Sequence, residues 1–141
     1  MIEICFVCTG NTCRSIMAER IAKKMAKNLK IENIKFSSAG LNAKGDNITE
    51  NAQKALKSLG YDGRTRKSVL LKKIKPTTLY VAMTKSHKDR INAKKVICFD
   101  DLSCGVDDPY GKSLEVYVSC AKQIEQNVSI LLKQIENLRR Q

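Results

Sequence analysis

The sequence has no tryptophan and a single histidine, His87. Without tryptophan, and without aromatic residues interleaved among basic ones, it offers no stacking platform for nucleic acid. One histidine, together with the lack of any Cys-x2-Cys pair, argues against a zinc site. No apolar run approaches the ~20 residues that a membrane-spanning helix needs. We therefore expect no metal, no cofactor, no specific nucleic-acid partner and no membrane association.

The first residues, Met1-Ile2-Glu3-Ile4, lack the basic stretch and cleavage site of a secretory signal. We therefore expect a cytoplasmic protein. Six cysteines would suggest a disulfide framework in a secreted protein, but a cytoplasmic location keeps thiols reduced. Three of them lie in apolar patterns and are expected to be small core residues: Cys5, Cys98 and Cys120.

Acidic residues are scarce. The chain has 14 of them against 26 lysines and arginines, which gives a net charge of +12. A basic surface attracts acidic and phosphorylated partners, and it binds polyanions without specificity at low salt. The composition is thus compatible with phosphorylated protein substrates, and equally with a non-catalytic basic module that only binds phosphate.

Strand and helix patterns alternate along the chain, which indicates a parallel sheet covered on both faces. The expected strands are residues 2–8, 34–38, 78–83 and 95–99. The expected helices begin near Ser15, Thr49 and Ser113, with a short one at 86–93, and 65–74 is an amphipathic segment. The prediction is a single domain, residues 1–141, with a three-layer, doubly wound α/β fold of four parallel strands flanked by helices.

Two finer expectations concern individual side chains. We place His87 on a helix surface, without a catalytic role. In the long C-terminal helix, apolar residues recur at helical spacing and are expected to face inward: Val116, Ala121, Ile124, Val128, Leu131, Leu132, Ile135 and Leu138.

The most informative stretch connects the first strand to the first helix. Its residues are Cys8, Thr9, Gly10, Asn11, Thr12, Cys13, Arg14 and Ser15. Gly10 and Asn11 tolerate positive φ, so the backbone N–H groups can converge on an anion at a helix N-terminus. The planar fork of Arg14 can clamp two phosphoryl oxygens, and the same positive field favours the reactive thiolate of Cys8. The pattern predicts a phosphate site with a nucleophile at its base.

This octet resembles the active-site loop of the low-molecular-weight protein tyrosine phosphatases. The resemblance extends over nearly the whole chain, through Ser38-Ala39-Gly40 and the late Asp107-Asp108-Pro109-Tyr110-Gly111. It implies a four-stranded, doubly wound sheet and hydrolysis of phosphotyrosine through a phosphocysteine intermediate, with inorganic phosphate as product. Cys8 would be the nucleophile, Arg14 the phosphate clamp and Asp108, directly before proline, the general acid and then base.

The resemblance also implies supporting roles. The backbone of residues 9–15 would hold the phosphate oxygens, and Ser15 would donate a hydrogen bond to the thiolate of Cys8. Asn11 and Ser38 would brace the loop. Beside the acid, Pro109 completes the motif, and Tyr110 would form a wall of the substrate cleft.

Cys13 matches a second cysteine that is often present in this family. Such a cysteine can form a reversible disulfide with the nucleophile and protect it from over-oxidation. The alternative is that Cys13 is simply a small residue that packs inside the fold.

Two positions depart from the usual pattern of the family. Ile16 replaces a proline at the start of the first helix, where proline is favourable but not required. Thr12 replaces a bulky aliphatic residue, and threonine is characteristic of the branch that resembles protein-arginine phosphatases. The substrate alternatives are therefore phosphotyrosine, which the family as a whole favours, and phosphoarginine, which Thr12 favours.

A further alternative is a thioredoxin-coupled arsenate reductase, which has nearly the same loop. That chemistry needs a relay pair of cysteines after the third strand. Met83 and Thr84 stand there instead, and Cys98 and Cys104 come one strand later.

Overall fold

A computed structural model describes residues 1–140 and contains one sheet of four parallel strands. The strands are β1 (Ile2–Cys8), β2 (Ile34–Gly40), β3 (Leu79–Ala82) and β4 (Val96–Cys98). Their order is β2-β1-β3-β4, so β1 has a neighbour on either side. The central place of β1 explains its nearly continuous apolar sequence. The predicted four-stranded, doubly wound parallel sheet is confirmed.

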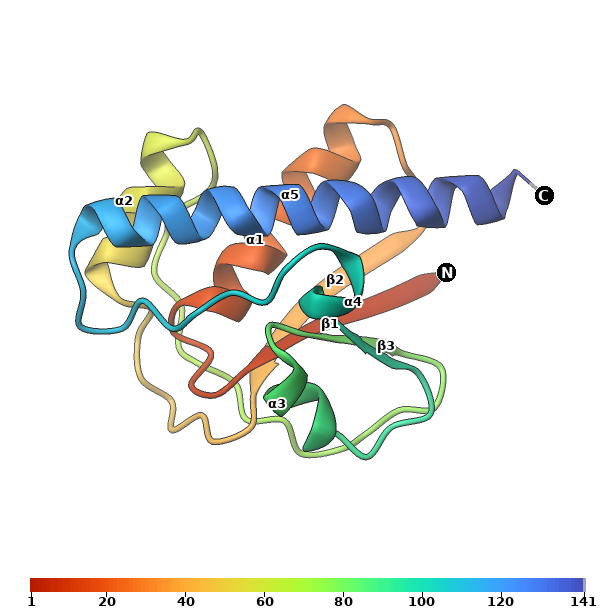
Figure 1. The fold of residues 1–141 in the computed structure, drawn as a ribbon, viewed down its shortest axis with the longest axis horizontal. Coiled ribbons are helices and arrows are strands. Elements are labelled where there is room, and N and C mark those ends of the chain that lie inside the picture. Colours follow the sequence, from red (N-terminus) through yellow and green to blue (C-terminus); the bar gives the residue numbers. More distant parts are fainter. Residues whose placement is uncertain (141) are drawn as a thin grey trace.

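Helices cover the sheet on both faces. They are α1 (Arg14–Asn28), α2 (Glu50–Ser58), α3 (Lys85–Asp89), α4 (Phe99–Leu102) and α5 (Leu114–Arg139). In Figure 1, α1, α2 and α5 lie on one side of the sheet and α3 lies on the other. The long helix α5 packs across both α1 and α2, which closes the larger core.

Residues of β1 alternate between two cores, as expected for a strand buried on both faces. Ile4 and Phe6 belong to the larger core with α1, α2 and α5. Cys5 and Val7 belong to a smaller core on the opposite face. The amphipathic segment 65–74 is irregular, and its later apolar residues pack on this smaller core. The second face is therefore covered partly by a non-helical segment.

The sheet order also fixes where a ligand can bind. From β1 the chain moves to β2 on one side, and it later returns to β3 on the other side. At such a switch point the connections after neighbouring strands diverge, which leaves a crevice at the carboxyl ends of the strands. The loop that follows β1, residues 9–13, lies at this crevice.

Two of the predicted inward positions of α5 are wrong. Val116 is 41% exposed and Leu138 is 68% exposed, whereas the six between them are buried or partly buried. Tyr117 and Cys120 take the inward positions near the start of α5. At the other end, α5 projects past the sheet, so Leu138 has no core to pack against (Figure 1).

The expected core cysteines Cys5, Cys98 and Cys120 are buried, which confirms that prediction. Burial raises the pKa of the Cys120 thiol to about 12. Within residues 1–140, none of the helices has the length and hydropathy needed to cross a bilayer.

We predict that Leu132→Ala destabilises the fold by about 2–5 kcal/mol, because it removes a fully buried side chain and leaves a cavity. Leu138→Ala, in the last turn of the same helix, should change the free energy of unfolding by less than about 0.5 kcal/mol. Urea unfolding of both variants checks this. Equal losses would contradict the exposed position of Leu138.

Candidate active site

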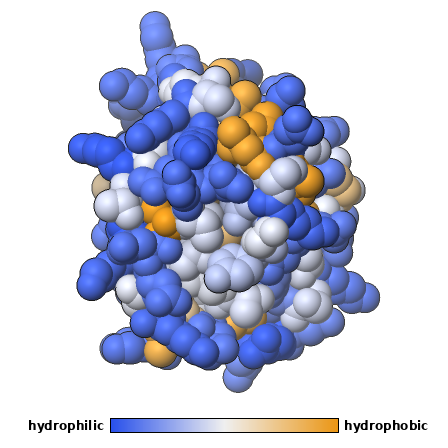
Figure 2. Space-filling model, turned by 90° about the vertical axis from the view of Figure 1, so that its left-hand side faces the viewer, coloured by the Kyte–Doolittle hydropathy of each residue, from blue (hydrophilic) through white to orange (hydrophobic). Residues whose placement is uncertain are grey.

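The loop after β1 forms the floor of a cleft of about 250 Å³. Figure 2 views the molecule from this end, where a weakly polar surface is surrounded by hydrophilic side chains. Three separate parts of the chain line the cleft: the loop and start of α1, the segment after β2, and the segment before α5. The lining residues are Cys8 to Arg14, Asn42, Lys44, Asp46, Asp108 and Tyr110.

Cys8 is the last residue of β1, and its side chain is buried at the base of the cleft. Its Sγ lies 2.9 Å from the Oγ of Ser15. The backbone N–H of Asn11 donates to the same sulfur over 3.3 Å. Both contacts suit a sulfur that carries negative charge, since each can place a hydrogen on it.

The N-terminus of α1 faces this sulfur and lacks an acidic residue in its first turn. Its cap residue, Cys13, makes no side-chain hydrogen bond to the helix in the part of the chain that the structure describes. By contrast, Thr49 caps α2 and Ser113 caps α5 with a side-chain oxygen. The first N–H groups of α1 are therefore available to an anion in the cleft.

Arg14 connects the loop with the segment that precedes α5. It is buried, and its Nη1 donates to the backbone oxygen of Val106 over 2.9 Å. Its Nη2 lies 3.8 Å from Oδ2 of Asp108. The fold thus brings Arg14 and Asp108 together although they are far apart in the sequence.

Asp108 is half exposed, and its Oδ1 accepts the backbone N–H of Tyr110 over 3.1 Å. This local turn keeps the carboxylate at the cleft. The intervening Pro109 is buried, whereas Tyr110 is 67% exposed and lines the cleft. The neighbouring carboxylate, Asp107, does not line it.

Asn11 holds the loop in its tight turn. Its φ is +57°, whereas Gly10 does not take a positive φ. The Nδ2 of Asn11 donates to Ser15 Oγ over 2.7 Å and to Ser38 Oγ over 3.0 Å. Its Oδ1 accepts from Arg66 over 2.6 Å and from the backbone N–H of Val69 over 2.9 Å. Asparagine tolerates the left-handed region better than most residues, and these four bonds fix it there.

Two further residues of this network were missed by the sequence analysis. Glu19, on α1, is buried, and its Oε1 accepts from Ser38 over 2.7 Å and from Arg66 over 3.0 Å. A signal for Glu19 was present, because an acidic residue stands in the apolar stripe of α1. Arg66 lies in an irregular segment, where nothing in the local sequence indicates a partner.

Gly40 ends β2 directly beside the loop, in register with Cys8. A Cβ at this position would lie 2.6 Å from the backbone oxygen of Thr9 and 2.9 Å from the carbonyl carbon of Gly10. Both neighbours are backbone atoms, so they cannot rotate away. The loop packs against Gly40 at a distance that no other residue permits.

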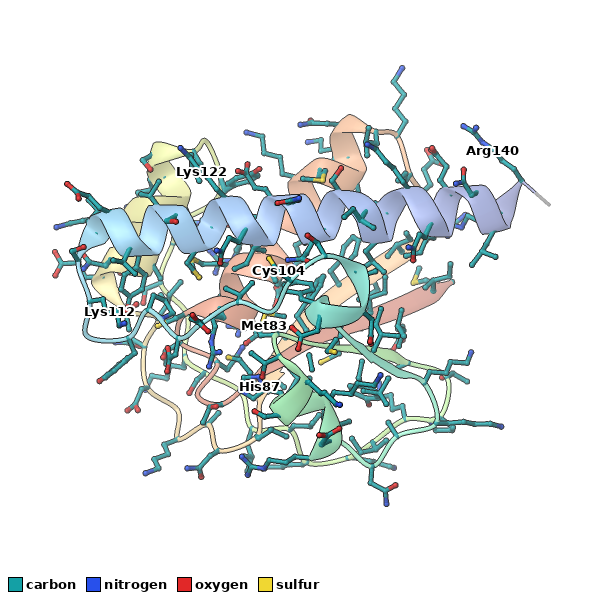
Figure 3. The ribbon with its side chains drawn as sticks, in the orientation of Figure 1. Met83, His87, Cys104, Lys112, Lys122 and Arg140 are labelled. Carbon is teal, nitrogen blue, oxygen red and sulfur yellow. The ribbon has the colours of Figure 1, made fainter. Side chains whose placement is uncertain are left out.

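The predicted surface position of His87 is wrong. His87 is only 5% exposed, and its Nε2 lies 2.9 Å from Thr9 Oγ1. Its Nδ1 lies 2.9 Å from Thr84 Oγ1. Figure 3 labels Met83 and His87, which flank the turn from β3 into α3. Thr84 is the N-cap of α3, so His87 lies in the first turn of this short helix, with its side chain directed back toward the helix start and the loop after β1.

Cys13 also lines the cleft, and its side chain is buried. Its Sγ is 3.3 Å from the hydroxyl of Tyr117 and 3.4 Å from Thr49 Oγ1. Burial raises the pKa of Tyr117, and the hydrogen bond to Cys13 adds to this effect. All six cysteines are free thiols in the described part of the chain, so a disulfide between Cys8 and Cys13 stays a prediction.

The described residues, 1–140, contain no group of three or more histidine, cysteine, aspartate or glutamate side chains that could hold a metal ion.

The family described as low molecular weight phosphotyrosine protein phosphatase matches residues 3–141. The chain belongs to this family. Members of this low-molecular-weight phosphatase family are cysteine-dependent phosphatases, which makes the chain an enzyme of that class.

Among relatives of this low-molecular-weight phosphatase, a protein-arginine-phosphatase of Geobacillus stearothermophilus is 34% identical, with 95% of this chain and 96% of the relative covered. The protein-tyrosine-phosphatase Wzb of Escherichia coli K12 is 31% identical, with 89% of each chain covered. A solved structure of a cysteine-to-serine mutant of the YwlE arginine phosphatase, with its active-site serine phosphorylated, covers 99% of each chain at 30% identity and a TM-score of 0.86. The family therefore includes relatives named for two different substrates.

We predict that Gly40→Ala lowers the phosphatase activity roughly ten-fold or more, because the added methyl displaces the loop backbone that forms the cleft floor. Ser37→Ala, at an exposed position of the same strand, is the matched control and should leave activity near the wild-type value. Steady-state kinetics on both variants checks this. Full activity of the Gly40 variant would mean that the loop can move away from β2.

Proposed function

We propose that this protein hydrolyses phosphotyrosine in phosphorylated proteins through a covalent phosphocysteine intermediate, without a metal or cofactor. One observation carries the proposal. A buried thiol, an arginine fork and a carboxylate converge on one cleft, and the N-terminus of a helix without an acidic or side-chain cap faces it. These are the groups that phosphoryl transfer needs: a nucleophile, charge stabilisation and a proton donor.

In the first step, the thiolate of Cys8 attacks phosphorus, and the bond from phosphorus to the tyrosine oxygen breaks. Arg14 and the N–H groups of residues 9–15 hold the equatorial oxygens. Protonated Asp108 donates its proton to the departing phenolic oxygen. The products of this step are tyrosine and phosphocysteine.

In the second step, Asp108 accepts a proton from a water molecule while the water oxygen attacks phosphorus. The phosphorus–sulfur bond breaks, inorganic phosphate leaves and the thiolate of Cys8 returns. The contact of the sulfur with Ser15 and with the N–H of Asn11 supports Cys8 both as attacking and as leaving group. The phosphorylated active-site serine in the YwlE arginine phosphatase is consistent with a covalent intermediate in a relative.

The rest of the cleft suits a peptide side chain. The ring of Tyr110 stands exposed at the cleft and offers an aromatic wall for the substrate ring. Ser38, on β2, supports the loop by accepting a hydrogen bond from the side chain of Asn11. The cytoplasm is the compartment that we propose, because it would keep the thiol of Cys8 reduced.

Phosphoarginine is the second candidate substrate, and Thr12 is the observation that favours it. Thr12 lines the cleft, where its hydroxyl can hydrogen-bond a guanidinium group or a water molecule. The relative from Geobacillus stearothermophilus is named a protein-arginine-phosphatase. In that reaction Asp108 would protonate the guanidinium nitrogen as the phosphorus–nitrogen bond breaks.

We predict that phosphate release from a phosphotyrosine peptide disappears in Cys8→Ser. The test measures release from phosphotyrosine and phosphoarginine peptides of the same sequence, with that variant as the blank. A strong preference for phosphoarginine that Thr12→Ile reverses would replace tyrosine by arginine as the substrate.

No release from either peptide by folded, reduced protein would reject both substrates. Arsenate reduction and phosphate binding would then be measured. Arsenate reduction that is lost in Cys98→Ser would indicate the reductase, and binding of phosphate without turnover would indicate a binding module.

We predict that Asp108→Asn lowers kcat roughly 100-fold to 10,000-fold, because the amide can neither donate nor accept the required proton. Asp107→Asn is the matched control, since Asp107 does not line the cleft, and it should stay within about two-fold of wild type. A substrate with a good leaving group should reduce the loss in Asp108→Asn, because such a group leaves without protonation. An equal effect of the two substitutions would reject Asp108 as the acid.

A further inference from the structure

We propose that His87 is a positioning residue that holds the hydroxyl of Thr9 as an additional hydrogen-bond donor to the phosphate in the cleft. This inference rests on the proposed phosphatase function. It extends the phosphate site beyond the loop N–H groups and Arg14 to a side chain on the opposite face of the sheet.

The geometry leaves His87 little freedom. Both ring nitrogens lie 2.9 Å from a threonine hydroxyl, Nε2 from that of Thr9 and Nδ1 from that of Thr84. Thr9 belongs to the phosphate loop and Thr84 ends the segment after β3, so the ring bridges two neighbouring strand ends. The side chain is buried, which makes both contacts costly to lose.

The proposed role of Thr9 requires a particular direction for each of these bonds. Thr84 Oγ1 accepts the backbone N–H of His87 as the cap of α3, over 3.4 Å. The hydroxyl of Thr84 can donate its own proton to Nδ1 or to Ser86 Oγ, which lies 3.3 Å away. Donation to Nδ1 places the ring hydrogen on Nε2, the tautomer that the proposed role of Thr9 requires. Nε2–H donates to Thr9 Oγ1, and the proton of Thr9 is left to be donated elsewhere.

Thr9 lines the cleft and is exposed to it. In the proposed arrangement its remaining proton is available to a phosphate oxygen bound in the cleft. A threonine whose hydroxyl rotated freely could equally present a lone pair to the anion, which would repel it. The bond from His87 fixes the favourable orientation before the ligand arrives.

Charge around the ring keeps this arrangement neutral. Burial, followed by the positive charges of Arg14 and Arg90, lowers the pKa of His87 to about 4, and Asp108 opposes the shift. These groups come from α1, from the end of α3 and from the segment before α5. A protonated ring would place a hydrogen on Nδ1 and reverse its bond with Thr84, so the orientation of Thr9 requires the neutral form.

The first test determines the tautomer of the wild-type protein by two-bond ¹H–¹⁵N NMR at neutral pH. His87 is the only histidine, so its signals need no assignment by mutation. Hydrogen on Nε2 supports the proposal. Hydrogen on Nδ1, or a mixture of tautomers, overturns it, and neither result depends on catalysis.

The second test is a double-mutant cycle with Thr9→Val and His87→Leu, read as the Kd of inorganic phosphate and as kcat and KM. Each single variant should weaken phosphate binding roughly 10-fold, the size expected for one hydrogen bond to an anion. The double variant should be no weaker than either single one, because His87 acts through Thr9. Additive losses would overturn the proposal.

Matched variants separate positioning from folding. Thr9→Ser retains the hydroxyl and should bind phosphate nearly as well as wild type. Lys85→Ala, at an exposed position of α3, should leave the Kd unchanged. If His87→Leu fails to fold, phosphate binding by Thr9→Val and the tautomer of His87 in the wild-type protein still test the proposal. Unchanged phosphate binding in Thr9→Val overturns the inference, whereas the absence of turnover in wild type would reject only the proposed function.

Discussion

The left-handed turn at Asn11 is the constraint on which the site depends. It bends the chain so that the N–H of Asn11 points at Cys8, and it places the start of α1 behind the same sulfur. A single residue in this conformation is costly unless its surroundings hold it. Here hydrogen bonds with α1, β2 and the segment after α2 hold the Asn11 side chain, so three separate parts of the fold keep the turn in place.

A pair of oppositely charged side chains belongs to the network that holds Asn11. Glu19 and Arg66 form an ion pair at 3.0 Å, and Ser38 donates to the same carboxylate oxygen. Such a pair gains little over a well-packed apolar contact. Lys23 is a second cation for Glu19, at 2.7 Å, so the carboxylate keeps a charged partner even without Arg66. Asn11 and Ser38 are also hydrogen-bonded to each other and to Arg66, so these contacts form together only while the loop keeps its shape. Stability of the fold and geometry of the phosphate site are thus determined by the same contacts.

The sequence predicted those features that are encoded locally. The apolar run of β1, the loop from Cys8 to Ser15 and the start of α1 follow one another in the chain, so pattern and chemistry were visible together. Contacts between distant segments were expected only where the family resemblance supplied them, as for Asp108 and Ser38. The pair of Arg66 with Glu19 had no such signal and was not predicted. His87 was misplaced for a related reason. The periodicity of apolar residues shows which face of a helix is apolar, but it does not show how far the neighbouring surface extends along that helix. Leu138 is exposed for the same reason.

The start of α1 also has a consequence for the thermodynamics of the whole molecule. In the described part of the chain, α2, α3 and α5 each begin with a hydroxyl oxygen that caps the first turn, whereas the side chain of Cys13 makes no such bond at the start of α1. An anion bound in the cleft would take that place. An anion that binds the folded chain alone shifts the folding equilibrium by mass action. Under the proposed function, inorganic phosphate, the product, is such an anion, and we expect the protein to be most resistant to unfolding where phosphate is abundant.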